Sequence, residues 1–338
     1  MKAVAYHQSL PIDDPQALQD VQLDVPTPGP RDLLVEVRAI SVNPVDTKIR
    51  RNVAPEGGQP KVLGWDAAGV VKAVGSDVTL FKVGDEVSYA GAINRAGANS
   101  ELHLVDERIV GRKPRSLPFA EAAAMPLTAI TAWELLFDRL QVADGTADQG
   151  QSLLIVGAAG GVGSMLVQLA RQLTGLTVIG TASRPETQAW VRELGAHHVI
   201  DHSKPLNEEL VRIGIPQVSH VASLTQTDLH YDALVEALAP QGRLALIDDP
   251  LQPLDVMKLK RKSISLHWEL MFTRSLFETA DMIEQHRLLD RVADLVDAGT
   301  LKTTLGEHFG TINADNLRRA HALLESGKAK GKIVLEGF

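Results

Sequence analysis

A glycine-rich turn is the stretch of this sequence whose residue types and spacing predict specific chemistry. Residues 153–156 are aliphatic and partly β-branched, which is typical of a buried parallel strand. The turn that follows, residues 157–163, contains four glycines, and glycine lets a backbone bend tightly and approach a ligand. A helix expected from Met165 would direct its N–H groups and positive dipole end at a pyrophosphate. The turn therefore predicts a dinucleotide-binding site.

One residue of the turn departs from the usual G-x-G-x-x-G spacing, which would place glycine where Ala158 stands. A second apolar run, residues 176–182, follows at the distance expected for a strand–helix–strand unit and strengthens the interpretation. The alternative is a strand–turn–helix corner that binds no ligand.

The end of the second apolar run bears on the choice of nicotinamide cofactor. An NAD site usually places an acidic residue there, where it bonds the ribose hydroxyls and would repel a 2′-phosphate. This run ends without an acid, and Ser183 and Arg184 follow it. Ser183 can donate a hydrogen bond, and the Arg184 guanidinium is a planar fork suited to phosphate. We therefore predict NADPH rather than NADH; the alternative for Arg184 is a solvated surface charge.

The composition excludes several other function classes. The 338 residues carry a formal net charge of −8 without a block of like charges, which argues against nucleic acid or an anionic membrane as partner. The chain has no cysteine, so disulfides, cysteine nucleophiles and thiolate zinc sites are excluded. Its first residues follow a strand pattern rather than that of a signal peptide. With 44% hydrophobic residues, we expect a folded, cytoplasmic protein of two domains.

Short strands are expected to position the N-terminal part of the site. Residues 1–115 contain runs of alternating apolar and polar residues, such as residues 33–40, separated by turn clusters such as residues 26–30. We therefore predict an all-β, barrel-like domain there. From Pro118 helix-forming residues take over, and Pro126 is expected to divide them into two helices.

Strand and helix patterns alternate from residue 152 onward. The expected strands are residues 153–156, 176–181, 198–201, 218–223 and 243–247, and the expected helices are residues 165–173, 185–194 and 231–238. Such alternation predicts a doubly wound parallel sheet. After Asp255 the alternation is expected to stop. Two amphipathic helical patterns then follow over residues 276–298 and 316–326, and residues 331–335 form a last strand.

Several short motifs follow one another in a characteristic order along the chain. They are residues 43–50 (NPVDTKIR), 64–71 (GWDAAGVV), 83–87 (VGDEV), 123–129 (AAMPLTA), the glycine turn and residues 331–334 (GKIV). Together they resemble the medium-chain dehydrogenase/reductase superfamily, most closely its zinc-free quinone oxidoreductases and its zinc-type alcohol dehydrogenase-like proteins.

The resemblance implies an α/β architecture in which a GroES-like β-barrel catalytic domain accompanies a Rossmann domain with a doubly wound parallel sheet. We expect the catalytic domain over residues 1–122, the Rossmann domain over residues 123–262 and a return to the catalytic domain over residues 263–338. The resemblance also implies an active site in the cleft between the domains. It further implies a homodimer, often formed by extending the Rossmann sheet across the interface.

The resemblance also identifies where the zinc alcohol dehydrogenases of the family hold their catalytic metal. In those enzymes the ligands are a cysteine, a histidine beside a glutamate, and a second cysteine. Here Asn43 stands at the first cysteine's position, Trp65 at the histidine's and Asp66 at the glutamate's. Because catalytic zinc needs about three protein ligands, we expect no bound metal.

The resemblance further assigns cofactor contacts. Near the nicotinamide they are Asn43, Thr128, Ile247, Lys332 and the turn residues Ala159, Gly160, Gly161 and Val162. His202 matches a position where related reductases place a tyrosine near the 2′-phosphate. Three alternatives stay open: Thr128 as a helix cap, Lys332 as a solvated charge, and His202 as a loop histidine without a ligand.

Three residues are candidates for catalysis and two for the substrate pocket. Lys48 stands where quinone oxidoreductases often have a tyrosine, and its ammonium could donate a hydrogen bond or proton to a developing oxyanion. Asp46 could orient Lys48 or Arg50, or cap the helical turn, and Tyr89 could offer a phenol. Trp65 and His267 could line the pocket. The structural alternatives are an exposed lysine, a packing tyrosine, a core tryptophan and a satisfied histidine.

These observations predict a zinc-independent, NADPH-dependent reductase of quinones or α,β-unsaturated carbonyls. Without a Lewis acid to polarise a carbonyl, hydride transfer favours small molecules that accept hydride by conjugation. The alternatives are a metal-free alcohol or aldehyde dehydrogenase and a low-turnover NADPH-binding protein, either crystallin-like or a sensor. The glycine turn does not separate these three, because all of them bind the nucleotide.

Overall fold

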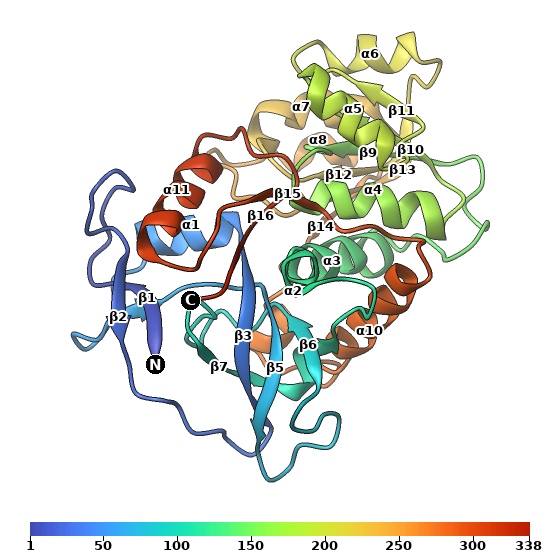
Figure 1. Cartoon of the computed structure of the whole chain (residues 1–338). Coiled ribbons are helices and arrows are strands. Elements are labelled where there is room, and N and C mark those ends of the chain that lie inside the picture. Colours follow the sequence, from blue (N-terminus) through green and yellow to red (C-terminus); the bar gives the residue numbers. More distant parts are fainter. The chain divides into compact units, whose positions relative to one another are not determined.

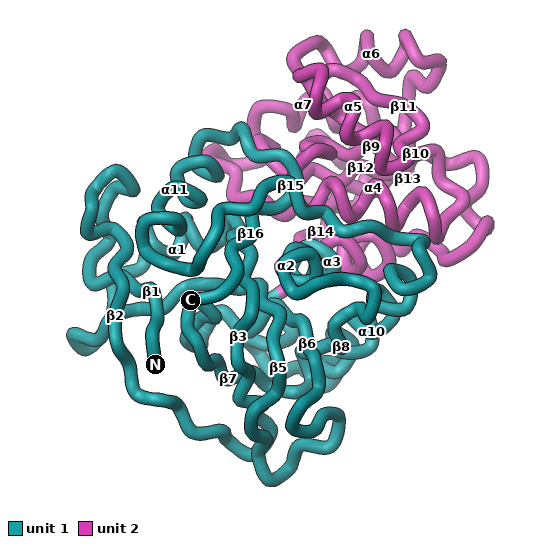
Figure 2. The backbone as a smooth tube through the Cα atoms, in the orientation of Figure 1, with its two compact units in different colours: residues 1–130, 272–338 teal, residues 131–271 magenta.

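The computed structural model describes residues 1–338, and the chain forms two compact units (Figure 1, Figure 2). Unit 1 comprises Met1–Ile130 and Phe272–Phe338, and unit 2 comprises Thr131–Met271. We predict domain transitions after residues 122 and 262. In the structure, helix α2 (Phe119–Ala123) packs on strands of unit 1, and strand β14 (Ser265–Trp268) belongs to the sheet of unit 2.

Unit 1 is built on a seven-stranded sheet around the long strand β3 (Asp32–Val42). β3 pairs antiparallel with β5 (Ala67–Val74), β7 (Leu102–Asp106) and β16 (Lys332–Glu336), so the last strand of the chain lies beside its longest one. The order is β15-β16-β3-β5-β6-β8, with β7 on β3. The other strands are β6 (Glu86–Tyr89), β8 (Val110–Arg112) and β15 (Leu305–His308).

The rest of unit 1 consists of a small sheet and several helices. The small sheet has the order β2-β1-β4, from β1 (Lys2–Tyr6), β2 (Gln19–Gln22) and β4 (Lys61–Val62). The helices are α1 (Pro44–Asn52), α2, α9 (Thr273–Leu276), α10 (Glu284–Asp297) and α11 (Ala314–Glu325), with a 3₁₀ turn at Glu107–Ile109.

Helix α1 corrects the expectation that residues 1–115 are all-β. Pro44 occupies its first turn and Asn43 forms a capping box with Asp46, so a helix starts directly after β3. The helix expected over residues 276–298 is also shorter than predicted, because α10 begins only at Glu284.

Unit 2 contains a six-stranded, all-parallel sheet in the order β11-β10-β9-β12-β13-β14. Strand β9 (Ser152–Val156), which precedes the glycine turn, is buried along its whole length. From β9 the sheet grows first on one side and then on the other, which confirms the predicted doubly wound parallel sheet. The other inner strands are β10 (Thr177–Thr181), β12 (Val218–Ser223) and β13 (Leu238–Leu246), and β11 (His198–Ile200) forms one edge of the sheet.

Strand β14 corrects the expectation that strand–helix alternation stops after Asp255. It pairs in parallel with β13, with Arg243 opposite Ser265 and Leu246 opposite Trp268, and it forms one edge of the sheet. None of its side chains is fully buried. The sequence therefore lacks the apolar run that identified the inner strands.

Helices connect the strands of unit 2. They are α4 (Gly161–Leu173), α5 (Pro185–Glu193), α6 (Leu206–Arg212), α7 (Thr227–Ala237) and α8 (Met257–Lys260). Helix α6 was not expected. Helix α3 (Pro126–Trp133) carries the chain into the unit and continues as a π-helix at Glu134–Arg139, and Pro126 separates α3 from α2 as predicted. No helix of the chain has both the length and the apolar character that a membrane crossing requires.

Candidate functional site

The glycine turn lies between β9 and α4 and is held by short-range hydrogen bonds. The chain leaves β9 with Gly157 in the left-handed region (φ +81°), which favours glycine. The Gly157 N–H donates to Thr181 Oγ1 (3.1 Å), so the turn is tied to the end of β10. Gly160 precedes α4, and its carbonyl accepts the Ser164 N–H (2.8 Å). The first N–H groups of α4 have no acceptor within the helix and can therefore bind an anion.

Packing around Ala158 explains the departure from the usual glycine spacing. Ala158 is fully buried, and a Cβ added to Gly180 of β10 would lie 2.9 Å from the Ala158 Cβ. Gly180 thus leaves room for the methyl group at position 158. A Cβ on Gly163 would lie 2.4 Å from the Gly157 carbonyl oxygen, so the last glycine lets α4 pack against the turn.

The backbone predicted to face the cofactor is accessible. Ala159, Gly160, Gly161 and Val162 are all partly exposed, whereas Ala158 is buried. These residues follow the carboxyl end of β9, which has β10 on one side and β12 on the other. At such a point the strand order reverses, and doubly wound sheets bind their ligands there.

The residues predicted to contact a 2′-phosphate follow the neighbouring strands β10 and β11. Ser183 is exposed, and Arg184 is half-buried at the start of α5. Arg184 Nε lies 3.1 Å from a Glu186 carboxylate oxygen, so the guanidinium forms an ion pair with an acidic side chain of the same helix start. His202 Nδ1 lies 3.1 Å from Thr181 Oγ1, and burial lowers the pKa of this histidine. Thr181 therefore links the glycine turn to His202.

Two further residues lie near the carboxyl ends of the parallel strands of unit 2. Ile247 follows β13, and its N–H donates to the Ser223 carbonyl at the end of β12 (3.4 Å). His230 of α7 places its ring 6.2 Å from that of His202 in an edge-to-face arrangement. The structure thus brings the turn, Arg184, His202 and Ile247 to the end of the sheet at which the carboxyl ends of its parallel strands lie. His230 was not predicted, because only the folded chain brings α7 beside His202.

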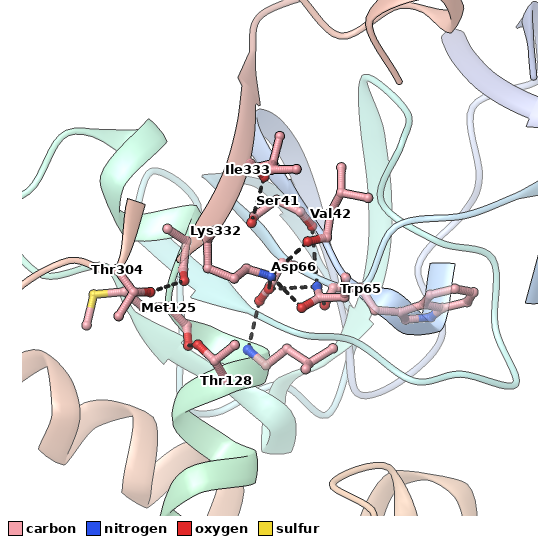
Figure 3. Close-up of polar contacts among 12 residues, drawn as sticks. Ser41, Val42, Trp65, Asp66, Met125, Thr128, Thr304, Lys332 and Ile333 are labelled. Atoms are coloured by element: carbon pink, nitrogen blue, oxygen red, sulfur yellow. Dashed lines mark hydrogen bonds and ion pairs between the residues drawn. The ribbon is translucent and has the colours of Figure 1, made fainter. Parts of the chain in front are cut away.

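A buried ion pair in unit 1 joins residues from distant parts of the chain (Figure 3). Lys332, the first residue of β16, is 3% exposed, and Asp66, just before β5, is fully buried. Lys332 Nζ lies 2.9 Å from Asp66 Oδ2, and it also donates to the Val42 carbonyl (3.0 Å) and to Asn43 Oδ1. The ammonium, which carries three donors, is therefore satisfied by three oxygens. Lys332 is not the solvated charge that we kept as an alternative.

Asp66 receives hydrogen bonds on both of its carboxylate oxygens. Asn43 Nδ2 donates to Oδ2 (2.8 Å), beside the Lys332 ammonium, and the Leu127 N–H donates to Oδ1 (2.8 Å). Leu127 lies in the first turn of α3, so the carboxylate also faces the positive end of that helix. Burial raises the pKa of Asp66, while the ammonium and the hydrogen-bond donors oppose that rise.

Asp46 and Thr128 form local hydrogen bonds in the same unit. Asp46 accepts the Asn43 N–H on Oδ2 (2.7 Å) and the Gly64 N–H on Oδ1 (2.9 Å). Burial raises the pKa of Asp46 to about 7. The Thr128 hydroxyl donates to the Met125 carbonyl (3.0 Å) at the start of α3. Asp46 therefore anchors the segment that carries Asn43.

Comparison with known proteins places these features in a family. The model of the alcohol dehydrogenase GroES-like domain matches residues 29–126, and the zinc-binding dehydrogenase model matches residues 194–335. A zinc-type alcohol dehydrogenase-like protein of Staphylococcus aureus is 39% identical over 99% of both chains. The chain belongs to the medium-chain dehydrogenase/reductase superfamily. A quinone oxidoreductase of Pseudomonas aeruginosa is 32% identical over 95% of this chain and 96% of its own.

Solved structures agree with this membership in the superfamily. A Rhizobium etli protein described as a candidate zinc-dependent alcohol dehydrogenase is 59% identical, with a TM-score of 0.97 over 100% of this chain and 98% of that one. The quinone oxidoreductase of Escherichia coli, complexed with NADPH, is 26% identical, with a TM-score of 0.84 over 99% and 100% of the two chains. The predicted combination of a GroES-like domain with a Rossmann-type sheet is confirmed.

The donor set of this dehydrogenase/reductase does not fit the zinc ion that the names of some relatives imply. Zinc binds thiolate, imidazole and carboxylate groups, and a catalytic site uses about three of them. The structure contains no group of three or more His, Cys, Asp or Glu side chains that could hold a metal ion. Asn43 and Asp66 bond the Lys332 ammonium instead, and the Trp65 indole N–H donates to the Ala92 carbonyl (3.1 Å).

The two polar candidates outside this cluster lie in different surroundings. Lys48 is partly exposed on α1. Tyr89 is fully buried, and burial raises the pKa of its phenol. Its hydroxyl donates to His103 Nδ1 (3.0 Å), while His103 Nε2–H donates to the Ala96 carbonyl (2.9 Å). The Tyr89 hydroxyl is thus part of a closed hydrogen-bond chain inside unit 1.

The two candidates for the substrate pocket belong to different units. Trp65 is fully buried in unit 1, with its ring 6.4 Å from that of Phe272 in an edge-to-face contact. His267 lies partly buried in the edge strand β14 of unit 2, and burial lowers the pKa of its imidazole.

Asp66 is a site residue to which the sequence analysis assigned no role. The sequence held a signal for it, because the aspartate interrupts an apolar stretch, residues 64–71. Charged side chains are almost never fully buried unless they are paired. A buried Asp66 therefore demanded a cationic partner, but the sequence did not identify which one.

A second buried carboxylate cluster, in unit 2, was also not predicted. Glu134 lies in the π-helix and Glu269 follows β14, and both are buried. Arg139 Nε donates to Glu269 Oε2 (2.8 Å). Burial and the hydrogen-bonded Glu134 carboxyl raise the pKa of Glu269 well above its usual range.

Proposed function

We propose that this protein is a zinc-independent, NADPH-dependent oxidoreductase that transfers hydride to quinones or α,β-unsaturated carbonyls. The proposal rests on one observation: the Lys332 ammonium is bonded to Asn43, at the position of the zinc enzymes' first cysteine ligand, and to Asp66, at the position of the glutamate beside their histidine ligand. A Lewis acid such as zinc polarises a simple aldehyde or ketone, whereas a conjugated acceptor delocalises the incoming charge and depends less on polarisation.

The glycine turn and the end of β10 support NADPH as the cofactor. The accessible backbone of residues 159–162 would hold the pyrophosphate at the start of α4. Ser183 and Arg184 would bind the 2′-phosphate, with Arg184 exchanging its Glu186 partner for the more highly charged phosphate. The E. coli quinone oxidoreductase, which is 26% identical, was solved with NADPH. Bound NADPH supplies the hydride, and the chain supplies position and electrostatics.

Lys48 is the residue that we propose as the hydrogen-bond or proton donor. Hydride transfer to a quinone or enone leaves negative charge on an oxygen, and an ammonium N–H stabilises such an oxyanion. Lys48 is partly exposed on α1, so its amine can reach a small molecule. Asp46 fixes the start of this helix through two backbone N–H groups, and we assign it a positioning role.

We also propose a homodimer that forms at the edge strand β14. The backbone of β14 is paired only on its β13 side, and Trp268 and Leu270 are 53% and 51% exposed. An open strand edge with large apolar side chains is what the same edge of a second copy would cover. Sedimentation of the wild type and of a Trp268→Lys variant tests the proposal, which predicts a dimer and a monomer respectively.

An NADPH-oxidation screen tests the proposed function. Quinones, enones and simple aldehydes would each be offered with NADPH or NADH, with and without a zinc chelator. The proposal predicts turnover of quinones or enones that prefers NADPH and ignores the chelator. Chelator-sensitive turnover of aldehydes would overturn it, chelator-resistant turnover of aldehydes or alcohols would favour the metal-free alcohol dehydrogenase alternative, and tight NADPH binding without turnover would favour a binding protein.

A further inference from the structure

Three oxygens in unit 1 converge on a single cation. They are the Val42 carbonyl oxygen, Asn43 Oδ1 and Asp66 Oδ2, and all three accept hydrogen bonds from Lys332 Nζ. Asn43 and Asp66 are 1% and 0% exposed, so water does not compete for these bonds. The ammonium places one N–H on each oxygen and has no donor left over.

Hydrogen bonds hold the backbone that carries Lys332 in place. The Lys332 N–H donates to the Thr304 carbonyl (2.8 Å), and the Thr304 hydroxyl donates to the Ala124 carbonyl (3.0 Å). On the opposite side, β16 pairs with β3 through the register Ile333 opposite Val42. Figure 3 shows the Lys332 side chain extending from β16 toward Asp66. The ammonium is thus held in place by the strand pairing of the fold.

The charges of the cradle match one monovalent cation. Asp66 contributes a carboxylate, while Val42 and Asn43 contribute neutral oxygens. The lysine charge balances the single negative charge, and a buried pair of this kind is stable when its remaining hydrogen bonds are made. A divalent ion on the same oxygens would stand beside the ammonium and be repelled by it.

We infer that the cradle of Val42, Asn43 and Asp66 is an ammonium-binding site whose occupant, Lys332, keeps the oxygens of Asn43 and Asp66 from binding a metal ion. The inference deepens the zinc-independent part of the proposed function and rests on it. Lys332 acts as a positioning residue for Asn43. The carboxamide accepts from Lys332 on Oδ1 and donates to Asp66 from Nδ2 (2.8 Å), so each end of the amide has one fixed partner.

Replacement of the tethered cation by a free one tests the inference. Lys332→Ala removes everything beyond Cβ, and n-propylammonium has the same atoms as the missing part. We expect the variant to lose roughly 6–20 °C in Tm, because one partner of a buried ion pair is gone. We expect about 100 mM n-propylammonium to restore more than half of that loss, because it binds only the folded state. Tetramethylammonium, which has no N–H donor, should restore none.

Matched variants separate this effect from general amine effects. Lys328→Ala removes an exposed lysine from the same segment and should show neither the loss nor the response to n-propylammonium. Lys332→Ala combined with Asp66→Asn should be more stable than Lys332→Ala, because no buried charge stays unpaired, and should lose the response to the amine. Equal effects of n-propylammonium and tetramethylammonium on Lys332→Ala would overturn the inference.

A measurement on the wild-type protein keeps the inference testable even if Lys332→Ala does not fold. Protein produced with added zinc and then freed of loosely bound metal should contain far less than one zinc per chain. A content near one zinc per chain would overturn the inference while leaving NADPH-dependent quinone reduction intact. Absence of quinone and enone turnover would instead defeat the proposed function, while zinc content and amine rescue would still decide the inference.

Discussion

Gly180 and Ala158 lie so close together that a Cβ on Gly180 would stand 2.9 Å from the Cβ of Ala158. The same added carbon would lie 2.6 Å from Val191 Cγ1 of α5. The usual dinucleotide-binding spacing places a glycine at position 158. Here that position is alanine, and the glycine that allows the close contact is Gly180 in the next strand. The backbone still packs closely at this point, because one of the two facing residues has no side chain.

We predict that Gly180→Ala costs about 1–3 kcal/mol of unfolding free energy, because it overpacks a filled interior. Adding Ala158→Gly should recover part of this loss by removing one of the two clashes. Gly160→Ala provides the contrast: its Cβ would meet nothing closer than the Gly157 carbonyl oxygen at 3.5 Å, so stability should hold while NADPH affinity falls. Urea unfolding and NADPH titration of all three variants measure both quantities. Equal stability of Gly180→Ala and the wild type would contradict the packing explanation.

We predict that Arg184→Ala weakens NADPH binding by roughly 10- to 100-fold and leaves NADH binding nearly unchanged. The reason is the loss of a charge-assisted bond to the 2′-phosphate, together with exposure of that phosphate to the unpaired Glu186 carboxylate. Arg192→Ala, an exposed arginine in the last turn of the same helix, is the control and should affect neither cofactor. Calorimetric titration gives the affinities. Similar losses for NADPH and NADH would remove Arg184 from the recognition of the phosphate.

Much of unit 2 could be predicted from the sequence because its inner strands are buried on both faces. β12 was predicted with its observed bounds, and β9 and β10 to within one residue, from their apolar composition. Strand β14 was not predicted, because an edge strand is covered on fewer sides and carries both apolar and polar side chains. Helix α1 was not predicted, because its short sequence is mostly polar and its start depends on the hydrogen bonds that Asp46 accepts from Asn43 and Gly64.

The cofactor half of the candidate site was easier to identify than the ion pair of unit 1. The glycine turn is one continuous stretch, so local spacing reveals it. Asp66 and Lys332 are separated by 266 residues, and only the pairing of β16 with β3 brings them together. A sequence can show that a buried aspartate needs a cation. Which of the 34 lysines and arginines supplies it depends on strand register.

We predict that Lys48→Ala lowers kcat for quinone or enone reduction roughly 100-fold, because the developing oxyanion loses its donor. The NADPH dissociation constant should change by less than about threefold, since Lys48 is proposed to act on the substrate rather than on the cofactor. Arg51→Ala removes a neighbouring exposed cation on α1 and serves as the control for general electrostatics. Steady-state kinetics and NADPH titration provide the two readouts. Unchanged turnover of Lys48→Ala would exclude this lysine from the mechanism.

The buried pair Glu134–Glu269 gives the stability of the protein a definite pH dependence. Burial and the neighbouring Glu134 raise the pKa of Glu269 in the folded state, and Arg139 opposes this only in part. The unfolded chain releases the same proton near the ordinary glutamate value, about 4.3. Above that pH this glutamate holds its proton in the folded state and has lost it in the unfolded state, so its contribution to the free energy of unfolding falls as the pH rises.

We therefore predict that the contribution of this one proton to the free energy of unfolding falls from about pH 5 upward, by at most about 1.4 kcal/mol per pH unit. Glu269→Gln should remove most of that slope, because the amide stays neutral and can still donate to Glu134 and accept from Arg139. At about pH 9 the variant should be the more stable protein. Glu193→Gln, an exposed site on α5, is the control and should keep the wild-type slope. Urea unfolding over this pH range measures the slopes, and parallel curves for Glu269→Gln and the wild type would show that no shared proton is held at the pair.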